Sequence, residues 1–190
     1  MGILKKITDE YFGKVKREED DIKSNIKYLS PVDIGGSVLW ANRDFVVKSD
    51  WYSKHGDYLK YSEVFGIKFE KGWRLPTVDE FLELFFVEDV IKVSEEISYN
   101  KSKRVYFEFG GDKLIFKNSG FRLDGYDELL FKGTSFLRWT SEKNDKNKTY
   151  LFDCSYDHDT AEEVRDNRDL LCSAEEKGGY FPVRLVKDKK

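Results

Sequence analysis

Apolar positions divide the chain into a helical N-terminal stretch and a longer region of short strands and turns. Over residues 1–29, apolar side chains recur at helical spacing, which predicts an amphipathic helix. Its apolar stripe consists of Ile3, Leu4, Ile7, Tyr11, Phe12 and Val15. A charged run over 16–21 continues the segment, and Pro31 marks a change of pattern. We therefore expect an N-terminal helix and charged linker over residues 1–30 and a folded domain over residues 31–190.

One helix stands out within the domain region. In the segment 75–80 (LPTVDE), Thr77 can cap a helix, and Glu80 follows three residues later. This spacing is that of a capping box, in which the two side chains bond each other's backbone N–H groups. We expect the helix to run to about Val90.

The rest of the domain region is predicted to form short strands. Alternating apolar residues over 105–109, the pair Gly110-Gly111 and the apolar run 114–116 predict a hairpin, because glycines allow the positive backbone angles of tight turns. Residues 42–71 are rich in aromatic residues and are expected to be a long irregular stretch. Further strands are expected at 37–41, 120–123, 128–131, 136–140, 150–153 and 180–186.

Composition and charge exclude several classes of protein. Hydrophobic residues make up 39% of the 190 residues and aromatic residues 16%, so the chain can fill a core and is not disordered throughout. The net charge of -3 argues against a dedicated nucleic-acid binder. No apolar run approaches the roughly 18 residues of a membrane span. No signal peptide is visible, so we expect an intracellular or phage-particle protein, or a cell-surface one if a signal was removed.

Six short segments of the domain region occur in an order that matches one known family. They are 32–41 (VDIGGSVLWA), 55–61 (HGDYLKY), 72–77 (GWRLPT) followed by Glu80, Phe81 and Leu84, 120–122 (GFR), 136–141 (FLRWTS) and 179–185 (GYFPVRL). Together they resemble the bacterial major paralogous domain (FISUMP) family over about residues 32–187. Phe81 stands where the family has Trp, and residues 86–119 are longer than the corresponding family segment.

The resemblance implies an α+β, C-type-lectin-like fold with short twisted antiparallel strands and one or two helices. This branch of the fold contains the formylglycine-generating enzymes and the variable receptor-binding proteins of some phages. In it, the first and last strands pair, which would bring Trp40 near Val183, and loops at the far end form the binding face. By this resemblance, recognition would lie in residues 142–177.

The composition of residues 142–177 suits a binding surface, although a merely solvated loop is the alternative. Tyr, Asn, Asp and Arg combine contact area with adaptable hydrogen bonds. The expected ligand-binding residues are Asn144, Tyr150, Tyr156, Asp157, His158, Asp159, Arg165, Asn167 and Arg168.

A metal site is an alternative chemistry for the same segment. Formylglycine-generating relatives use a cysteine pair with copper, and Cys154, His158 and Cys172 could hold copper or zinc. Their surroundings do not match that motif, however, and their spacing is not that of zinc motifs. The three aspartates of 153–159 could bind calcium, but they fail the EF-hand pattern. We expect no metal, no cofactor and no catalytic residue, and two ordinary thiols or, alternatively, one disulfide.

Three arginines lie in the matched segments: Arg74, Arg122 and Arg184. They could form an anion pocket. We favour a structural role, because one guanidinium among short strands can bond several loop carbonyls at once.

These observations predict a non-catalytic module of a phage or bacterial surface or particle assembly, which binds a protein or glycan receptor. The N-terminal apolar stripe would pack on its own domain, on another copy or on a particle protein. One alternative is a structural particle protein attached by this helix. A less favoured one is a metal-dependent, oxidase-like enzyme of the formylglycine-generating type.

Overall fold

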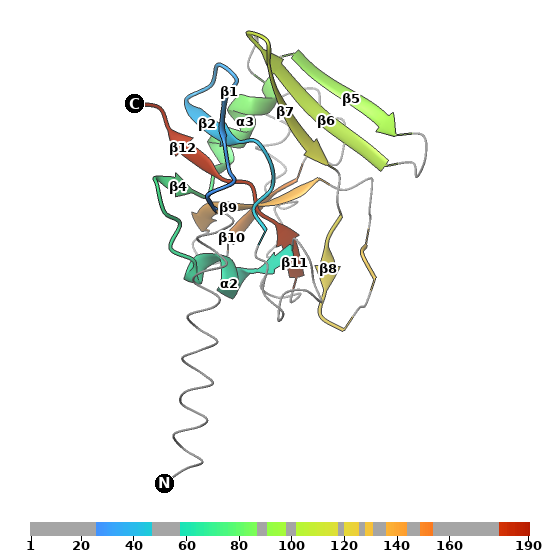
Figure 1. The fold of residues 1–190 in the computed structure, drawn as a ribbon. Coiled ribbons are helices and arrows are strands. Elements are labelled where there is room, and N and C mark those ends of the chain that lie inside the picture. Colours follow the sequence, from blue (N-terminus) through green and yellow to red (C-terminus); the bar gives the residue numbers. More distant parts are fainter. Residues whose placement is uncertain are drawn as a thin grey trace.

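The structure is a computed structural model that describes residues 26–46, 58–86, 91–97, 102–117, 120–125, 128–130, 136–143, 149–153 and 179–190. Within these ranges the fold is α+β, with short strands in four small antiparallel sheets and two helices between them (Figure 1). The N-terminal apolar stripe lies outside the described residues. Neither described helix is long and apolar enough to cross a membrane.

The largest sheet joins the two ends of the domain. Its strand order is β1 (Pro31–Asp33), β2 (Val38–Ala41), β12 (Val186–Asp188) and β4 (Trp73–Arg74). The expected pairing between an early strand and the last strand is therefore present. Its register differs from the expectation, because Trp40 lies opposite Val186, while Val183 forms a bridge with Phe45.

The closing strand expected over 180–186 is two strands that belong to different sheets. β11 (Gly179–Pro182) pairs with β3 (Tyr58–Lys60) and β8 (Arg122–Leu123), and β12 joins the first sheet. The prediction of one strand was wrong because the apolar run hides the change of sheet. Pro182 has no backbone N–H, so the ladder of β11 cannot continue regularly beyond it.

The stretch 42–71 is also more regular than expected. It contains β3 and the helix α2 (Tyr61–Gly66), which starts where the Glu63 carboxylate accepts a hydrogen bond from Lys60 N–H at 2.7 Å. A short helix of this kind carries little periodicity, so the sequence pattern missed it. In contrast, the strand expected at 128–131 reduces, within the described residues, to one bridge between Leu130 and Phe121.

A three-stranded sheet contains the predicted hairpin. β6 (Ser102–Phe109) and β7 (Asp112–Lys117) flank Gly110 and Gly111, whose φ angles of 56° and 93° confirm the expected glycine turn. β5 (Ile91–Ile97) pairs with β6 on its other side. The sequence analysis did not anticipate β5, because this segment mixes charged and apolar residues.

The last sheet is the hairpin of β9 (Leu137–Lys143) and β10 (Thr149–Asp153), which lies beside α3 (Val78–Phe86). The capping box of α3 is confirmed. Glu80 N–H donates to Thr77 Oγ1 at 3.1 Å, and Thr77 N–H donates to Glu80 Oε2 at 2.8 Å. The carboxylate of Glu142 on β9 accepts a further hydrogen bond from Val78 N–H at 2.9 Å.

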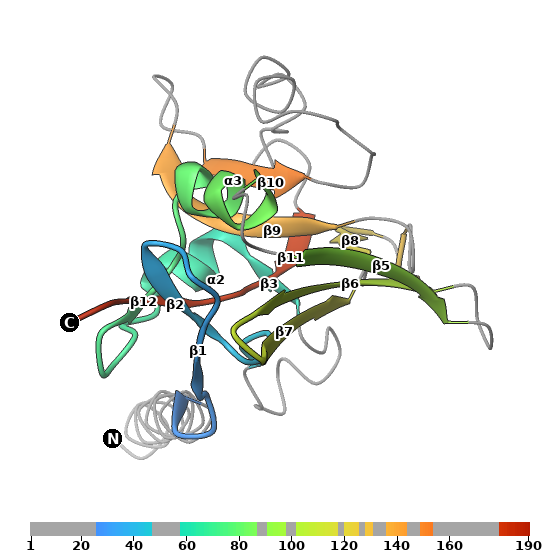
Figure 2. The ribbon, with the colours of Figure 1, turned by 90° about the horizontal axis from the view of Figure 1, so that it is seen from above.

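The β9–β10 hairpin separates two apolar cores. Leu137, Trp139 and Leu151 belong to one core, which also includes Ile26, Phe45 and Phe181. The other core includes residues of α3, which Figure 2 shows beside the β9–β10 hairpin, and there Phe81 stacks on Phe152 with ring centroids 4.6 Å apart. It also contains the following buried rings: Trp40, Phe107, Phe116 and Phe136. The polar groups described below are positioned by these two closely packed cores.

Candidate functional site

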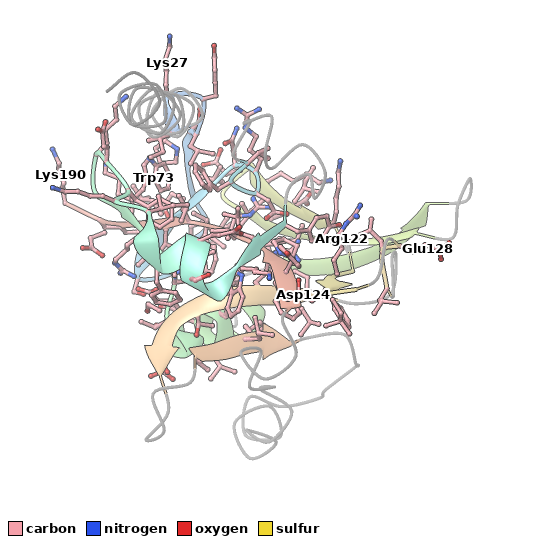
Figure 3. The ribbon with its side chains drawn as sticks, turned by 90° about the horizontal axis from the view of Figure 1, so that it is seen from below. Lys27, Trp73, Arg122, Asp124, Glu128 and Lys190 are labelled. Atoms are coloured by element: carbon pink, nitrogen blue, oxygen red, sulfur yellow. The ribbon has the colours of Figure 1, made fainter. Side chains whose placement is uncertain are left out.

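A polar cluster lies on the sheet formed by β3, β11 and β8. Lys60 Nζ lies 2.7 Å from Asp124 Oδ2, and the Tyr180 hydroxyl donates to Asp124 Oδ1 at 3.0 Å. The ammonium group also lies 4.8 Å from the centroid of the Tyr180 ring, within the range of a cation–π contact. We refer to Lys60, Asp124 and Tyr180 as the Lys60 cluster. Figure 3 shows this side from below, with Arg122 and Asp124 labelled.

Strand register brings the cluster together from three distant parts of the chain. Tyr180 of β11 is paired with Lys60 of β3 on one side and with Arg122 of β8 on the other. Paired residues lie on the same face of a sheet, so the side chains of Lys60 and Tyr180 are neighbours. Asp124 follows β8 directly, before a turn at Gly125, whose φ is 83°.

Apolar packing and one hydrogen bond hold the backbone beneath the cluster. Phe181, next to Tyr180, lies edge-on to Trp139 with ring centroids 5.2 Å apart. It also stacks on Phe121 with ring centroids 5.4 Å apart. Trp139 Nε1 donates to the carbonyl of Leu59, the residue before Lys60, at 2.9 Å. Because these supporting residues are packed in place, less conformational entropy is lost when a ligand binds the cluster.

Charge and exposure suit this cluster to binding. The hydrogen bond to Asp124 raises the pKa of Lys60, and burial raises the pKa of Tyr180. At neutral pH the ammonium is therefore charged and the phenol is neutral. About a third of the Lys60 side chain and half of the Asp124 side chain are exposed (31% and 53%). The surface thus presents a cation and an anion above the buried Tyr180, and these two groups can bind hydroxyl, amide and carboxylate groups.

Most of the sequence-predicted ligand residues lie outside the described residues: Asn144, Tyr156, Asp157, His158, Asp159, Arg165, Asn167 and Arg168. The same holds for Cys154, Cys172 and the N-terminal apolar stripe. Tyr150 lies in β10, at the irregularity of register between Thr149 and Leu151. Asp153 is the last residue of β10.

The start of the expected recognition segment and the residues just after its end are nevertheless described. Its start, Glu142, is tied to the first turn of α3 through Val78 N–H. Beyond its end, the chain re-enters the described structure at Gly179, which pairs with Leu123 next to Asp124. The Lys60 cluster therefore lies where the expected recognition segment rejoins the fold.

The structural role expected for Arg184 is confirmed. Its guanidinium donates to Ala41 O at 2.7 Å and to Ile115 O at 2.9 Å, and its carbon lies 4.2 Å from the centroid of the Phe116 ring. Arg184 is 2% exposed, so the guanidinium is enclosed by protein. Its hydrogen-bonding capacity serves to join the end of β2 to β7.

A second buried arginine, which the sequence analysis did not single out, lies beside it. Arg138 of β9 donates to Lys117 O at 2.8 Å and to Leu137 O at 2.9 Å. Asp44 accepts from both arginines, from Arg184 Nε at 2.8 Å and from Arg138 Nη2 at 3.0 Å. We refer to Asp44, Arg138 and Arg184 as the Asp44 cluster.

The pKa values of Asp44 and Arg184 in this cluster depend on burial and on the charges of their neighbours. Burial by itself would raise the pKa of Asp44, but the adjacent Arg138 and Arg184 guanidinium groups outweigh burial and hold this pKa below its usual value. Burial lowers the pKa of Arg184, against the opposing effect of Asp44. The cluster thus consists of two cations and one anion, and it fastens β7 to the core.

Arg74 also has a structural role. Its Nη2 donates to Glu80 at 2.6 Å and to Asp188 at 2.6 Å, and its Nη1 donates to Leu75 O at 3.2 Å. These contacts join β4, the start of α3 and the C-terminal strand. Arg122 pairs through its backbone with Tyr180 and lies next to the Lys60 cluster.

Sequence reasoning missed the Lys60 cluster as a site. Lys60 and Tyr180 lie in two of the family-like segments, and Asp124 begins an Asp-Gly turn, which was the available signal. Nothing in the spacing of the three residues indicates that they meet. In the part of the chain that the structure describes, no group of three or more His, Cys, Asp and Glu side chains is placed to hold a metal ion.

Comparison of the chain with protein-family models, curated proteins and solved structures finds no match.

Proposed function

We propose that this chain is a non-catalytic binding module with a C-type-lectin-like fold, related to the FISUMP family, that recognises a protein or glycan receptor. The module would belong to a phage or bacterial surface or particle assembly. Its binding surface would consist of the Lys60 cluster together with the ligand-binding residues expected from the sequence within 142–177.

Features of the fold support the C-type-lectin-like assignment. An early strand, β2, pairs with the closing strand β12, as the resemblance to the family implies. The family-like segment 72–77 leads into a capped helix, and Phe81 fills the core position where the family has Trp. The segments that carry the resemblance thus occupy structural positions at strand pairs and at a helix start.

The position of the Lys60 cluster is the observation that carries the proposed function. Its three side chains converge from three strands or strand ends, Lys60 and Asp124 are partly exposed, and the buried Tyr180 connects them to a packed aromatic support. Asp124 can accept hydrogen bonds, Lys60 can donate them, and the Tyr180 hydroxyl holds the Asp124 carboxylate in place. Glycans and polar protein surfaces both present groups that fit this combination.

Binding to bacterial surface material tests the proposal. The labelled chain would be applied to an array of purified bacterial surface polysaccharides and to immobilised envelope proteins. We expect Lys60→Met and Asp124→Asn to weaken binding about tenfold or more, because each removes a charged hydrogen-bonding group worth more than about 1.4 kcal/mol. Tyr180→Phe keeps the buried ring and removes only the hydroxyl that donates to Asp124, so it tests whether binding depends on the fixed position of this carboxylate.

Lys113→Met is the matched control. Lys113 is also a partly exposed lysine in an ion pair, with Glu108 at 3.2 Å, but it lies on β7 in another sheet. This variant should bind like the wild type. The proposal fails if the chain binds none of the polysaccharides or envelope proteins, or if Lys60→Met and Lys113→Met have equal effects.

A further inference from the structure

The strand β5 is an open edge of its sheet. All seven of its residues, Ile91–Ile97, are paired with β6, from Ile91 opposite Glu108 to Ile97 opposite Ser102. Among the described residues no strand pairs with its other side. Figure 1 shows β5 as the outermost strand of this sheet. Such an edge presents unpaired N–H and C=O groups and is a template for another strand.

The opposite edge of the same sheet is protected. There, Arg184 donates to Ile115 O and Arg138 donates to Lys117 O, so two guanidinium groups occupy carbonyls along β7. Covering an edge in this way is a common defence against unwanted pairing. The fold thus closes one edge with buried arginines, while β5 offers a regular strand of seven residues on the other edge.

The sequence of β5 is self-complementary when two copies run antiparallel. A register in which all seven residues pair is centred on Ser94, so that Ser94 faces its own copy. Lys92 then faces Glu96, and this opposite-charge pair occurs twice because of the two-fold symmetry. Ile91 faces Ile97, also twice. Opposite charges and apolar residues that face each other directly are favourable cross-strand pairs.

We propose that the partner of β5 is a second copy of this chain, joined through antiparallel β5–β5 pairing about a two-fold axis at Ser94. The two three-stranded sheets then form one continuous six-stranded sheet. A symmetric, isologous contact of this kind closes on itself and forms a dimer rather than a filament. A single strand pair is a small interface, so the dimer dissociates on dilution.

Charge reversal tests the register. In sedimentation velocity over a range of concentrations, the wild-type chain should show a monomer–dimer equilibrium. Lys92→Glu and Glu96→Lys each turn two attractive pairs into repulsive ones and should weaken dimerisation about tenfold. The double variant Lys92→Glu/Glu96→Lys restores opposite charges and should recover dimerisation. Glu95→Lys is the control, because Glu95 faces uncharged Val93 in this register.

Cross-linking provides a second test that does not depend on the charges. Facing residues of antiparallel strands have Cα atoms about 4.5–5.5 Å apart, a separation that a disulfide can span. In a background without Cys154 and Cys172, Ser94→Cys should give a disulfide-linked dimer on mild oxidation. Lys113→Cys, an exposed position on β7, should not. The proposal is overturned if the wild-type chain is monomeric at all concentrations, if the double variant does not recover, or if Ser94→Cys does not cross-link.

Discussion

Asp44 forms an ion pair with the buried Arg184, whose Nε donates to Asp44 Oδ1 at 2.8 Å, although 140 positions separate the two residues in the sequence. The other carboxylate oxygen of Asp44 accepts from Arg138 at 3.0 Å. Both guanidinium groups are almost fully enclosed, at 0% and 2% exposure. Asp44 is therefore the anion shared by two buried cations, and the position of β7 against the core depends on it.

Replacing Asp44 with Asn should strongly destabilise the fold. The substitution keeps the size of the side chain but leaves both guanidinium groups without a negative partner. Removing one partner of a buried ion pair costs about 3–5 kcal/mol. Urea denaturation followed by circular dichroism measures the free energy of unfolding. The control is Lys189→Met, which breaks an exposed ion pair with Asp33 and should cost less than about 1 kcal/mol.

Stability should also fall in acid through Asp44. Its pKa in the folded state is below its ordinary value of 3.8, so the ionised form stabilises the fold above that value. This contribution is lost as the pH falls below 3.8 toward the folded pKa, because protonation then removes the anion. We expect the free energy of unfolding to fall more steeply between pH 4 and pH 2 for the wild type than for Asp44→Asn. Parallel slopes for the two proteins would contradict this role.

Removing one of the two arginines should cost less than removing the shared carboxylate. Arg138→Met deletes the hydrogen bonds to Asp44 and Lys117 O, but it leaves Asp44 and Arg184 as a neutral pair. The Asp44–Arg184 pair that remains in Arg138→Met has no net charge, whereas Asp44→Asn leaves two buried cations without an anion, which costs more free energy. Urea denaturation should therefore rank Arg138→Met as more stable than Asp44→Asn. The reverse order would show that the hydrogen bonds to β7, rather than the charge balance, dominate.

The sequence predicted those features whose partners are close together along the chain. The box of Thr77 and Glu80 lies within one helical turn, and Gly110-Gly111 forms its hairpin turn by itself. A structural role for Arg184 could be inferred from residue type alone, because a buried guanidinium must find several acceptors. Its actual acceptors, Ala41 O and Ile115 O, depend on tertiary packing.

Sites assembled from distant segments could not be predicted in this way. Lys60 and Asp124 are 64 positions apart, and Tyr180 and Asp124 are 56 apart. None of the three stands out in its own segment, and only the order β3-β11-β8 brings them together. The division of the closing segment at Pro182 was missed for a related reason. Hydrophobicity shows that a strand is buried, but it does not show which sheet the strand joins.

Loss of the helix cap should give a moderate, local effect. Thr77→Ala removes the acceptor for Glu80 N–H at the start of α3 and should lower the free energy of unfolding by about 1 kcal/mol. Thr77→Ser keeps the hydroxyl and should lie close to the wild type in the same urea denaturation. A loss as large for Thr77→Ser as for Thr77→Ala would show that packing of the threonine methyl group, rather than capping, matters at this position.

Replacing Gly35 with Ala should destabilise the fold more than the same replacement at Gly125, which has a similar backbone conformation. Gly35 has a φ of 86°, and a Cβ there would lie 2.7 Å from the ring of Phe109. Gly125 has a φ of 83°, but a Cβ there would meet nothing within 4 Å. Gly125→Ala therefore measures the backbone cost alone, about 1–2 kcal/mol, to which Gly35→Ala adds the displacement of Phe109.

A double-mutant cycle isolates this added cost. The free energy of unfolding would be measured in urea for Gly35→Ala, Phe109→Ala and the double variant. We expect Gly35→Ala to be more destabilising than Gly125→Ala in the wild-type background. In the Phe109→Ala background the effect of Gly35→Ala should fall to that of Gly125→Ala, because the clash is gone. Equal losses for the two glycines with Phe109 present would mean that the ring, which is 36% exposed, moves aside at no cost and does not fasten β6 to the β1–β2 turn.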